Sequence, residues 1–246
     1  MLQKSGHFYL VLTAPIESDF SYNSPMVSDH EVKTFRQTVL SYYKQHGRHT
    51  LPWRTTHTTP YHILVSEIML QQTQVDRIIP KFLTFLAEFP TIHDLASAKQ
   101  STVLRLWSGL GYNRRALNLQ KAAQAITSQH NGVVPHTLAE LVALPGLGPY
   151  TASAILAFAY NQPVSVIETN IRTVYIHHFF ADQSAVTDSE ILSLVQATLN
   201  ESNPRQWYAA LMDYGAHLKS VHGNLSSRSQ SYTKQSKFVG SYRQLR

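Results

Sequence analysis

The sequence predicts an all-α fold, and three observations support this prediction. Apolar residues recur at helical spacing in most segments between residues 29 and 218. Residues that favour helix starts precede several of these segments, and prolines or glycines end them. A single short stretch, residues 8–12, has the character of a strand. No apolar run approaches the length of about 18 residues that a membrane span requires.

The first helix is expected from Asp29, with Phe35 and Val39 on its apolar face, and Gly47 closes it. Thr59 can cap a second helix that has Pro60 at its first position. Apolar spacing predicts further helices around residues 78–89, 95–96, 103–107, 116–126, 174–179, 191–199 and 207–218. We expect Asp188 or Ser189 to cap the helix at 191–199.

A tight glycine turn between two helices stands out at residues 137–160. Thr137 and Glu140 have the form of a capping box, and Pro145 stops the helix that they begin. Gly146 and Gly148 permit unusual backbone conformations before a second helix begins. Backbone N–H groups at a helix start bind anions, and DNA phosphate is the natural occupant. An ordinary turn between packed helices remains the alternative, whereas a dinucleotide fingerprint would need a third glycine and a preceding strand.

Composition limits the kinds of catalytic and metal-binding site that the chain can form. The 246 residues include no cysteine, which excludes disulfides, thiolate nucleophiles and cysteine-ligated clusters or zinc. None of the 13 histidines falls in a metal-ligand pair, so we expect no metal site. No secretory signal is recognisable, which favours an intracellular protein of the cytoplasm or nucleoid.

The net charge of +6 is concentrated after Ala216, where six basic residues occur without any Asp or Glu. This tail, residues 219–246, is interpreted either as a phosphate-binding arm or as a solvated segment. If it is an arm, its removal should weaken DNA binding and flatten the salt dependence. The six residues are Lys219, Arg228, Lys234, Lys237, Arg243 and Arg246.

Five motifs in order carry a resemblance to a known family. They are Leu51-Pro52-Trp53-Arg54, Ser66-Glu67-Ile68-Met69-Leu70-Gln71-Gln72-Thr73-Gln74-Val75, Gly109-Leu110-Gly111-Tyr112, the turn Leu144-Pro145-Gly146-Leu147-Gly148-Pro149-Tyr150-Thr151, and Met212-Asp213-Tyr214-Gly215-Ala216. Over roughly residues 30 to 218 the chain resembles the helix-hairpin-helix (HhH-GPD) DNA glycosylases of base excision repair, and the adenine-specific MutY type in particular.

The resemblance implies two helical lobes with double-stranded DNA in a cleft between them. One lobe would comprise residues 61–162, including the helix-hairpin-helix at 137–160. The other would combine residues 29–60 with 163–218. An extension, residues 1–28, would precede them, and the basic tail would follow. We expect a monomer acting on DNA that contains a mispaired or damaged base.

Glu67 is the candidate general acid. Ile63, Leu64 and Ile68 surround it in sequence, and an apolar setting should raise its pKa. A carboxylic acid that stays neutral near pH 7 can protonate a purine ring nitrogen and make the base a leaving group. A glutamate in a helix is more often a surface charge, but the resemblance assigns this position to the acid. It also matches Gln72 to the residue that fills the base stack when a base is flipped out.

Glu168 and Asn170 form the second candidate cluster, about 20 residues after the hairpin. In the resembled family the position of Glu168 is an aspartate that begins a helix and stabilises the sugar cation, and Asn170 matches a supporting residue. Glutamate keeps the charge, but it is a poorer N-cap and longer by one methylene. The alternative is that Glu168 only favours a helix N-terminus by its charge.

Tyr150 bears on the type of reaction. Relatives that also cut the strand carry a lysine at this hairpin position, whose amine attacks the sugar. Tyrosine cannot form a Schiff base, so we expect a monofunctional enzyme that leaves an abasic site. Tyrosine also occurs in related thymine-mismatch glycosylases, which leaves the substrate open.

The remaining candidates follow from the resemblance. Trp53, Arg54 and Leu70 would border the base pocket; the alternative for Trp53 is packing at a core edge. The DNA-contacting candidates are Gln72, Tyr112, Arg114, Arg115, Gly146, Gly148 and Thr151; simple surface charge is the alternative for either arginine. The family's four cysteines for an iron-sulfur cluster are absent after Gly215. We also expect the family's carboxy-terminal domain for 8-oxoguanine to be absent. A monovalent cation at the hairpin carbonyl groups stays open.

Three functions therefore compete at this point. The first is adenine excision, and the second is excision of thymine, uracil or another altered base. The third is DNA binding without catalysis, in which Glu168 would record a lost active site. The sequence leaves the opposing base and the repair partners undetermined.

Overall fold

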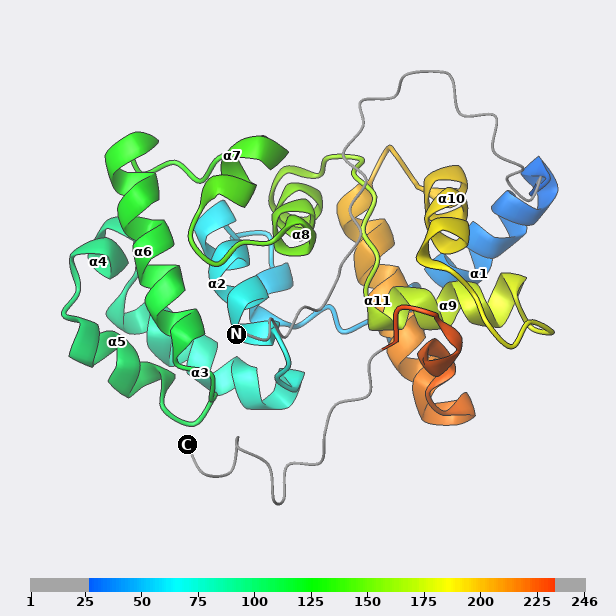
Figure 1. Cartoon of the computed structure of the whole chain (residues 1–246), viewed down its shortest axis with the longest axis horizontal. Helices are drawn as coiled ribbons and strands as arrows, with labels where there is room; N and C mark the ends of the chain where they lie inside the picture. Colours follow the sequence, from blue (N-terminus) through cyan, green and yellow to red (C-terminus); the bar gives the residue numbers. More distant parts are fainter. Residues whose placement is uncertain (1–26, 233–246) are drawn as a thin grey trace, which may run out of the picture.

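The computed structural model describes residues 27–232, and it confirms the all-α prediction over this range (Figure 1). The candidate strand at 8–12 lies outside the described residues. The helices of the described range are α1 (Asp29–His46), η1 (Pro52–Arg54), α2 (Pro60–Leu70), α3 (Val75–Glu88), α4 (Ile92–Ser97), α5 (Gln100–Trp107), α6 (Arg114–Gln129), α7 (Leu138–Ala143), α8 (Pro149–Tyr160), α9 (Thr169–Phe179), α10 (Asp188–Thr198), α11 (Pro204–His222) and η2 (Leu225–Arg228).

Capping residues set many of the helix starts. Full capping boxes begin α1, α2, α4 and α10, in each case from a Ser or Thr side chain that accepts a hydrogen bond from the third helical N–H group. The cap of α10 is Thr187, with Glu190 as its partner, and not Asp188 or Ser189 as expected. Asp188 is instead buried against Arg172, with Nε to Oδ1 at 2.8 Å and Nη2 to Oδ2 at 2.7 Å.

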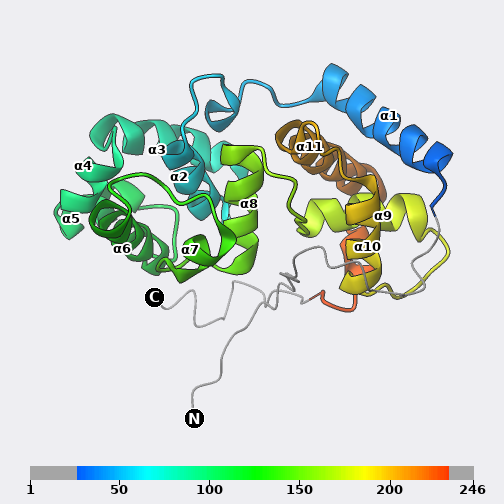
Figure 2. The ribbon, with the colours of Figure 1, turned by 90° about the horizontal axis from the view of Figure 1, so that it is seen from above.

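The described chain has two hydrophobic cores, which lie side by side in Figures 1 and 2. The first core is built by α2 to α8 and extends in sequence from Leu51 to Leu156. The second is built by α1 with α9, α10 and α11. Leu51 and Trp53 belong to the first core. The chain therefore passes from the second core to the first near residue 50, and not at the expected boundary near residue 60.

Helix α8 lies where the two cores meet and contacts both α2 and α11. Phe158 and Val164 pack against both cores. A polar link reinforces this junction, because Arg205 at the start of α11 donates its N–H group to Asn161 Oδ1 at 2.9 Å and its guanidinium to the Ala159 carbonyl. The two cores are therefore held together by apolar and polar contacts around α8.

The carboxy-terminal part of the described chain returns to the second core. Helix α11 continues to His222, and η2 packs against α9. Arg228 donates hydrogen bonds to the carbonyl groups of Phe180, Ala181 and Gln183. Ser229 Oγ donates to Asp188 Oδ1 at 3.2 Å. Residues 219–232 thus belong to the folded lobe rather than to a tail.

The other four basic residues of the expected tail, Lys234, Lys237, Arg243 and Arg246, lie outside the described residues. None of the helices in residues 27–232 has both the length and the apolar character that crossing a bilayer requires.

Candidate active site

Glu67 lies in the last turn of α2, a helix that is buried on almost every side. Eight of its eleven residues are buried, and Glu67 itself is only 9% exposed. Burial, together with the smaller effect of the negative charge of Glu168, raises the pKa of Glu67 to about 7, and Arg54 opposes the shift. A carboxyl group with this pKa is substantially protonated at neutral pH.

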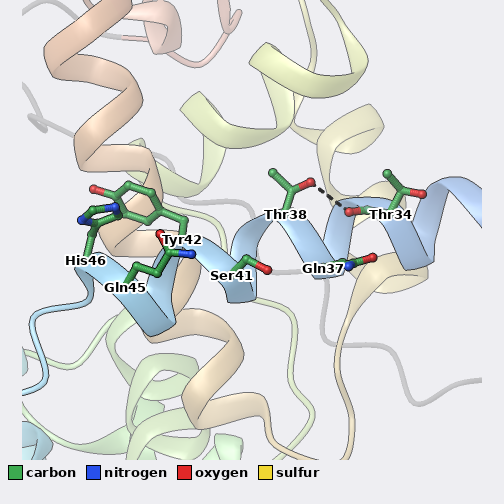
Figure 3. Close-up of a pocket in the computed structure, with 7 residues that line it drawn as sticks. All are labelled: Thr34, Gln37, Thr38, Ser41, Tyr42, Gln45 and His46. Carbon is green, nitrogen blue, oxygen red and sulfur yellow. Dashed lines mark hydrogen bonds between the residues drawn. The ribbon is translucent and has the colours of Figure 1, made fainter.

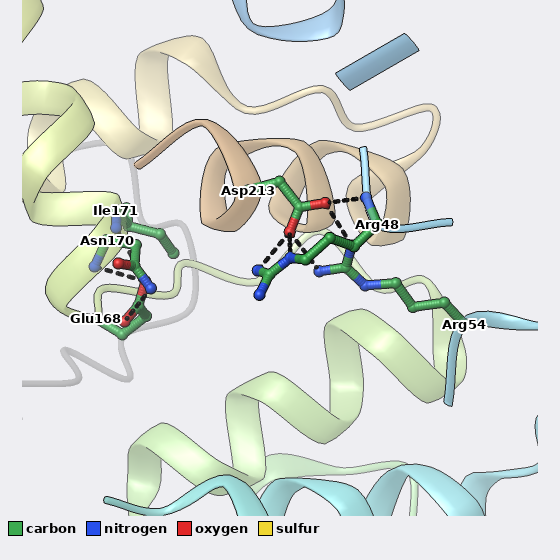
Figure 4. A network of polar contacts seen from close by, with 6 residues as sticks. All are labelled: Arg48, Arg54, Glu168, Asn170, Ile171 and Asp213. Atoms are coloured by element: carbon green, nitrogen blue, oxygen red, sulfur yellow. Dashed lines mark hydrogen bonds and ion pairs between the residues drawn. The ribbon is translucent and has the colours of Figure 1, made fainter. Parts of the chain in front are cut away.

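Glu168 is the N-cap residue of α9. Its Oε1 accepts the N–H groups of Asn170 at 2.7 Å and Ile171 at 3.0 Å, and the Asn170 side chain lies 3.4 Å from Oε2 (Figure 4). Burial raises the pKa of Glu168, although these hydrogen bonds and the charge of Arg172 favour its ionised form. The longer side chain therefore still caps its helix, by folding back over the first turn.

The two carboxyl groups come from different cores and sense each other's charge. Glu67 belongs to α2 in the first core, whereas Glu168 begins α9 in the second. Hydrogen bonds from Asn170 and Ile171 oppose the protonation of Glu168, whereas the charge of Arg54 opposes that of Glu67. A neutral acid beside a carboxylate is the arrangement used to break glycosidic bonds.

Asp213 is a polar centre that the sequence interpretation did not assign. Its side chain on α11 is 2% exposed and binds Arg54 Nη1 at 2.7 Å and Arg48 Nε at 2.8 Å (Figure 4). Burial raises the pKa of Asp213, but the hydrogen bonds and charges of Arg54 and Arg48 outweigh this and hold it below its usual value. The guanidinium of Arg54, expected at the base pocket, is thus held by Asp213 while its charge reaches Glu67. An aspartate inside an otherwise apolar helix face was the signal for this role.

Gly215 explains how α11 approaches the start of α9. A Cβ atom at this position would lie 2.2 Å from the carbonyl oxygen of Asn170 and 2.8 Å from its Cβ. Such distances are far below van der Waals contact, and the nearest atom belongs to the backbone. Only glycine therefore allows the two helices to meet beside Glu168.

The hairpin between α7 and α8 leaves its backbone accessible. Gly146 is exposed in a left-handed conformation at φ 82°, and an added Cβ there would lie 2.6 Å from Asn118 Cβ. Gly148 is the N-cap of α8 and supplies no side-chain cap to the first N–H groups of the helix. Thr151 is buried, and its Oγ1 accepts a hydrogen bond from Gln71 Nε2 at 3.2 Å. That bond ties the hairpin to the end of α2, four residues after Glu67.

The other candidates take varied positions. Gln72, Tyr112 and Arg114 are exposed, whereas the guanidinium of Arg115 turns inward to backbone carbonyl groups. Trp53 is buried with its ring 5.3 Å from that of Phe82, in agreement with packing inside the core. Leu70 is partly buried on the first core, and Tyr150 packs partly against the second.

A shallow pocket of about 540 Å³ lies elsewhere, along α1 (Figure 3). Hydroxyl, amide and imidazole side chains line it, all from this one helix: Thr34, Gln37, Thr38, Ser41, Tyr42, Gln45 and His46. It contains none of the residues that the sequence singled out. The two glutamates, and not this pocket, define the candidate site.

A glycine hairpin between two helices, set in a helical molecule with two cores, defines the helix-hairpin-helix class of fold. Residues 65–199 match the model of the HhH-GPD superfamily base excision DNA repair proteins, and the chain belongs to this family. The resemblance predicted from the five motifs is thereby confirmed.

Curated relatives narrow the similarity further. The adenine DNA glycosylase of Buchnera aphidicola subsp. Baizongia pistaciae is 39% identical over 186 residues, which cover 74% of this chain and 52% of the relative. That of Mycolicibacterium smegmatis is 40% identical over 179 residues, covering 72% and 61%. The human adenine DNA glycosylase is 37% identical over 197 residues, covering 76% and 36%. The chain thus spans about half the length of the curated relatives it matches.

Solved structures share the fold. A thermostable thymine-DNA glycosylase superposes with a TM-score of 0.65 at 23% identity, covering 75% of this chain and 86% of the other. A trapped endonuclease III–DNA covalent intermediate superposes with a TM-score of 0.58 at 19% identity, covering 77% and 85%. At these identities the likeness supports the fold alone.

The iron-sulfur cluster that the resemblance implies does not fit this chain. Such a cluster needs thiolate ligands, and the sequence contains no cysteine. Within residues 27–232, no group of three or more His, Asp or Glu side chains is arranged to hold a metal ion. The segment that follows α11 is instead held by the polar contacts of Arg228 and Ser229.

Proposed function

We propose that the protein is a monofunctional DNA glycosylase that hydrolyses the N-glycosidic bond of a flipped, mispaired adenine. The observation that carries the proposal is the pair of buried glutamates, one with a pKa of about 7 and the other held by backbone N–H groups at a helix start. Family membership and the curated relatives named adenine DNA glycosylase support it.

In the proposed reaction, Glu67 donates its proton to a ring nitrogen of the extruded base. The C1′–N bond breaks, and its electron pair leaves with the protonated base. The carboxylate of Glu168 stabilises the positive charge on the sugar, either directly or through a transient adduct, and Asn170 holds that carboxylate. Water then adds to C1′ and loses a proton, which leaves an abasic site. Tyr150 offers no amine, so the strand is not cut by a Schiff base.

The DNA contacts in this proposal come from the hairpin and from two loops. Gly146 and Gly148 expose backbone N–H groups that suit a phosphate at the start of α8. Gln72 fills the space left by the base, and Arg114 contacts the backbone. The phosphate contact once expected of Arg115 is not part of the proposal, because its guanidinium binds the protein interior. We predict that the protein acts inside the cell as a monomer on double-stranded DNA. A cation bound at the hairpin also stays a prediction.

The test is a single-turnover assay on duplexes that hold adenine, thymine, uracil or another altered base opposite each of several partners. We expect the fastest cleavage for mispaired adenine. Glu67→Gln should lower that rate by about 10²–10⁴-fold, because general acid catalysis contributes this much. Cleavage that does not depend on Glu67 would reject its assignment as the acid, and faster loss of thymine or uracil would reject adenine as the substrate.

DNA binding without catalysis is the second candidate function, and one observation favours it. Oε1 of Glu168 is occupied by two N–H groups of its own helix, so the side chain already has a structural task. This candidate predicts sequence-independent duplex binding with no cleavage of any base by the wild type. Measurable excision of any one base by the same assay would dismiss it.

A further inference from the structure

Arg115 is the second residue of α6, and its guanidinium caps the end of α2. Nη1 donates to the carbonyl oxygens of Ile68 at 2.9 Å, Met69 at 3.0 Å and Gln71 at 2.7 Å. The last carbonyl groups of a helix have no partner within it, and a cation suits the negative end of the helix dipole. One arginine therefore holds the turn that directly follows Glu67.

The other end of the same guanidinium reaches the loop between α5 and α6. Nη2 donates to the carbonyl oxygens of Leu110 at 3.1 Å and Gly111 at 3.2 Å, and to Thr73 Oγ1 at 3.2 Å. The guanidinium carbon also lies 5.3 Å from the centroid of the Trp107 ring and 5.6 Å from that of Tyr112. Arg115 thus joins two loops that are about 40 residues apart in the sequence.

Each of these loops carries one exposed non-glycine residue in a left-handed backbone conformation. Gln72 has φ 57° and lies between two acceptors of Arg115, Gln71 and Thr73. Tyr112 has φ 50° and directly follows a third acceptor, Gly111. Residues with a Cβ rarely adopt this conformation, and they keep it only where the surroundings enforce it. The contacts of Arg115 flank both residues and supply that enforcement.

We propose that Arg115 is a positioning residue that fixes Gln72 and Tyr112 as one rigid pair, at a set distance from each other and from the helix of Glu67. The inference rests on the proposed function, because such a pair has a task only when a base leaves the stack. A rigid pair meets the opened duplex without first being ordered, so base extrusion, and not initial binding, depends on Arg115.

The experiment compares Arg115→Met with the matched variant Arg105→Met, which removes the same charge from an exposed position on α5. Affinity is measured on a duplex containing the mispaired adenine. Extrusion is followed by stopped-flow fluorescence of 2-aminopurine placed next to that adenine, and excision by single-turnover rate. A second duplex places the adenine opposite an abasic site, where no pairing with an opposite base has to be broken.

On the mispaired duplex, Arg115→Met should slow extrusion and excision at least about tenfold, while affinity stays within about threefold. On the duplex with the abasic site most of the loss should disappear. Arg105→Met should match the wild type on both. A defect of equal size on both duplexes, or no defect on the mispaired one, would overturn the proposal.

Circular dichroism and thermal unfolding show whether Arg115→Met folds. If it does not, Arg115→Lys gives the same comparison, because lysine keeps the charge but cannot bridge two loops with a planar fork. Fluorescence reads extrusion without cleavage, so the two proposals fail differently. If the wild type neither extrudes nor cleaves, the glycosylase function and the positioning role are both overturned. If the wild type does both and Arg115→Met is unaffected, only the positioning role is overturned.

Discussion

At Glu67, the requirements of stability and of acid catalysis oppose each other. Its pKa of about 7 in the folded chain exceeds the ordinary value of 4.5, so the folded state binds its proton more tightly than the unfolded state. Stability from this group is therefore greatest at low pH and is lost as the pH rises from about 4.5 to about 7. The shift corresponds to a loss on the order of 3 kcal/mol at alkaline pH.

We therefore expect Glu67→Gln to raise the free energy of unfolding at pH 8 by up to about 3 kcal/mol and to change it little at pH 4. Urea unfolding at both pH values measures this difference. The exposed Glu88, at the end of α3, provides the control substitution Glu88→Gln, for which no such pH dependence should appear. Equal effects of Glu67→Gln at the two pH values would show that its carboxyl is not strained by burial.

In the proposed reaction Glu168 is needed in its ionised form and Glu67 in its protonated form. The wild-type rate should rise as Glu168 ionises and fall as Glu67 loses its proton near pH 7. Glu168→Asp, which restores a stronger N-cap, should keep the rate within about tenfold. Glu168→Gln should lower the rate about 10²–10³-fold through the lost charge.

The pH profile of Glu168→Gln separates these effects from a structural loss. Removing the like charge lowers the pKa of Glu67, so the alkaline limb of the single-turnover profile should move to lower pH. An alkaline limb that stays in place would mean that the two carboxyl groups do not interact.

Among the elements, α11 lies against the start of α9 at Gly215, next to the backbone of Asn170. Gly215→Ala would place a methyl group against the backbone of Asn170, so the start of α9 must shift. We expect a loss of about 1–3 kcal/mol in the free energy of unfolding and a lower excision rate. Ser220→Ala, at an exposed position on the same helix, serves as the control. A Gly215→Ala variant with wild-type stability and rate would refute the close approach.

The helices were predictable because each depends on local spacing and on nearby start and stop residues. Gly47 and Pro60 indicated helix limits within a few residues of the observed ones. The cap of α10 was not predictable in this way, because Thr187, Asp188 and Ser189 are all good N-caps. The choice among them depends on Arg172, which lies 16 residues away in the sequence and forms a hydrogen-bonded ion pair with Asp188.

In the candidate site, too, features that depend on sequence neighbours could be predicted, and features that depend on distant partners could not. Burial of Glu67 could be inferred from its apolar neighbours, but the inward turn of Arg115 and the pairing of Arg54 with Asp213 could not. These contacts join residues 42 to 47 and 159 positions apart, respectively. A pattern read along one helix does not contain such partners.

For the whole molecule, the distribution of basic residues bears on DNA affinity. A chain ending at residue 232 keeps the contacts of Arg228 and Ser229 and loses Lys234, Lys237, Arg243 and Arg246. We expect weaker duplex binding, a slope of log K against log salt shallower by up to about 3–4, and an unchanged melting temperature. Binding measured by fluorescence anisotropy at several salt concentrations tests this.

A chain ending at residue 218 provides the contrast, since it also loses η2 and should unfold at a lower temperature. If the chain ending at 232 bound DNA as the full chain does, at every salt concentration, the basic residues after 232 would be a solvated segment.

The origin of the two cores along the chain has a consequence for synthesis. The first core is contiguous, from Leu51 to Leu156, and can form as soon as that stretch has left the ribosome. Helix α1 emerges earlier, but it packs on α10 and α11, which are synthesised late. Arg48 likewise cannot bind Asp213 until that residue, 165 positions further on, has been synthesised. Pulsed hydrogen exchange during refolding should therefore protect α2 to α6 before α1. In this order Glu67 reaches its buried position early and Glu168 late. The proton donor and its anionic partner therefore come together only in the final step of folding.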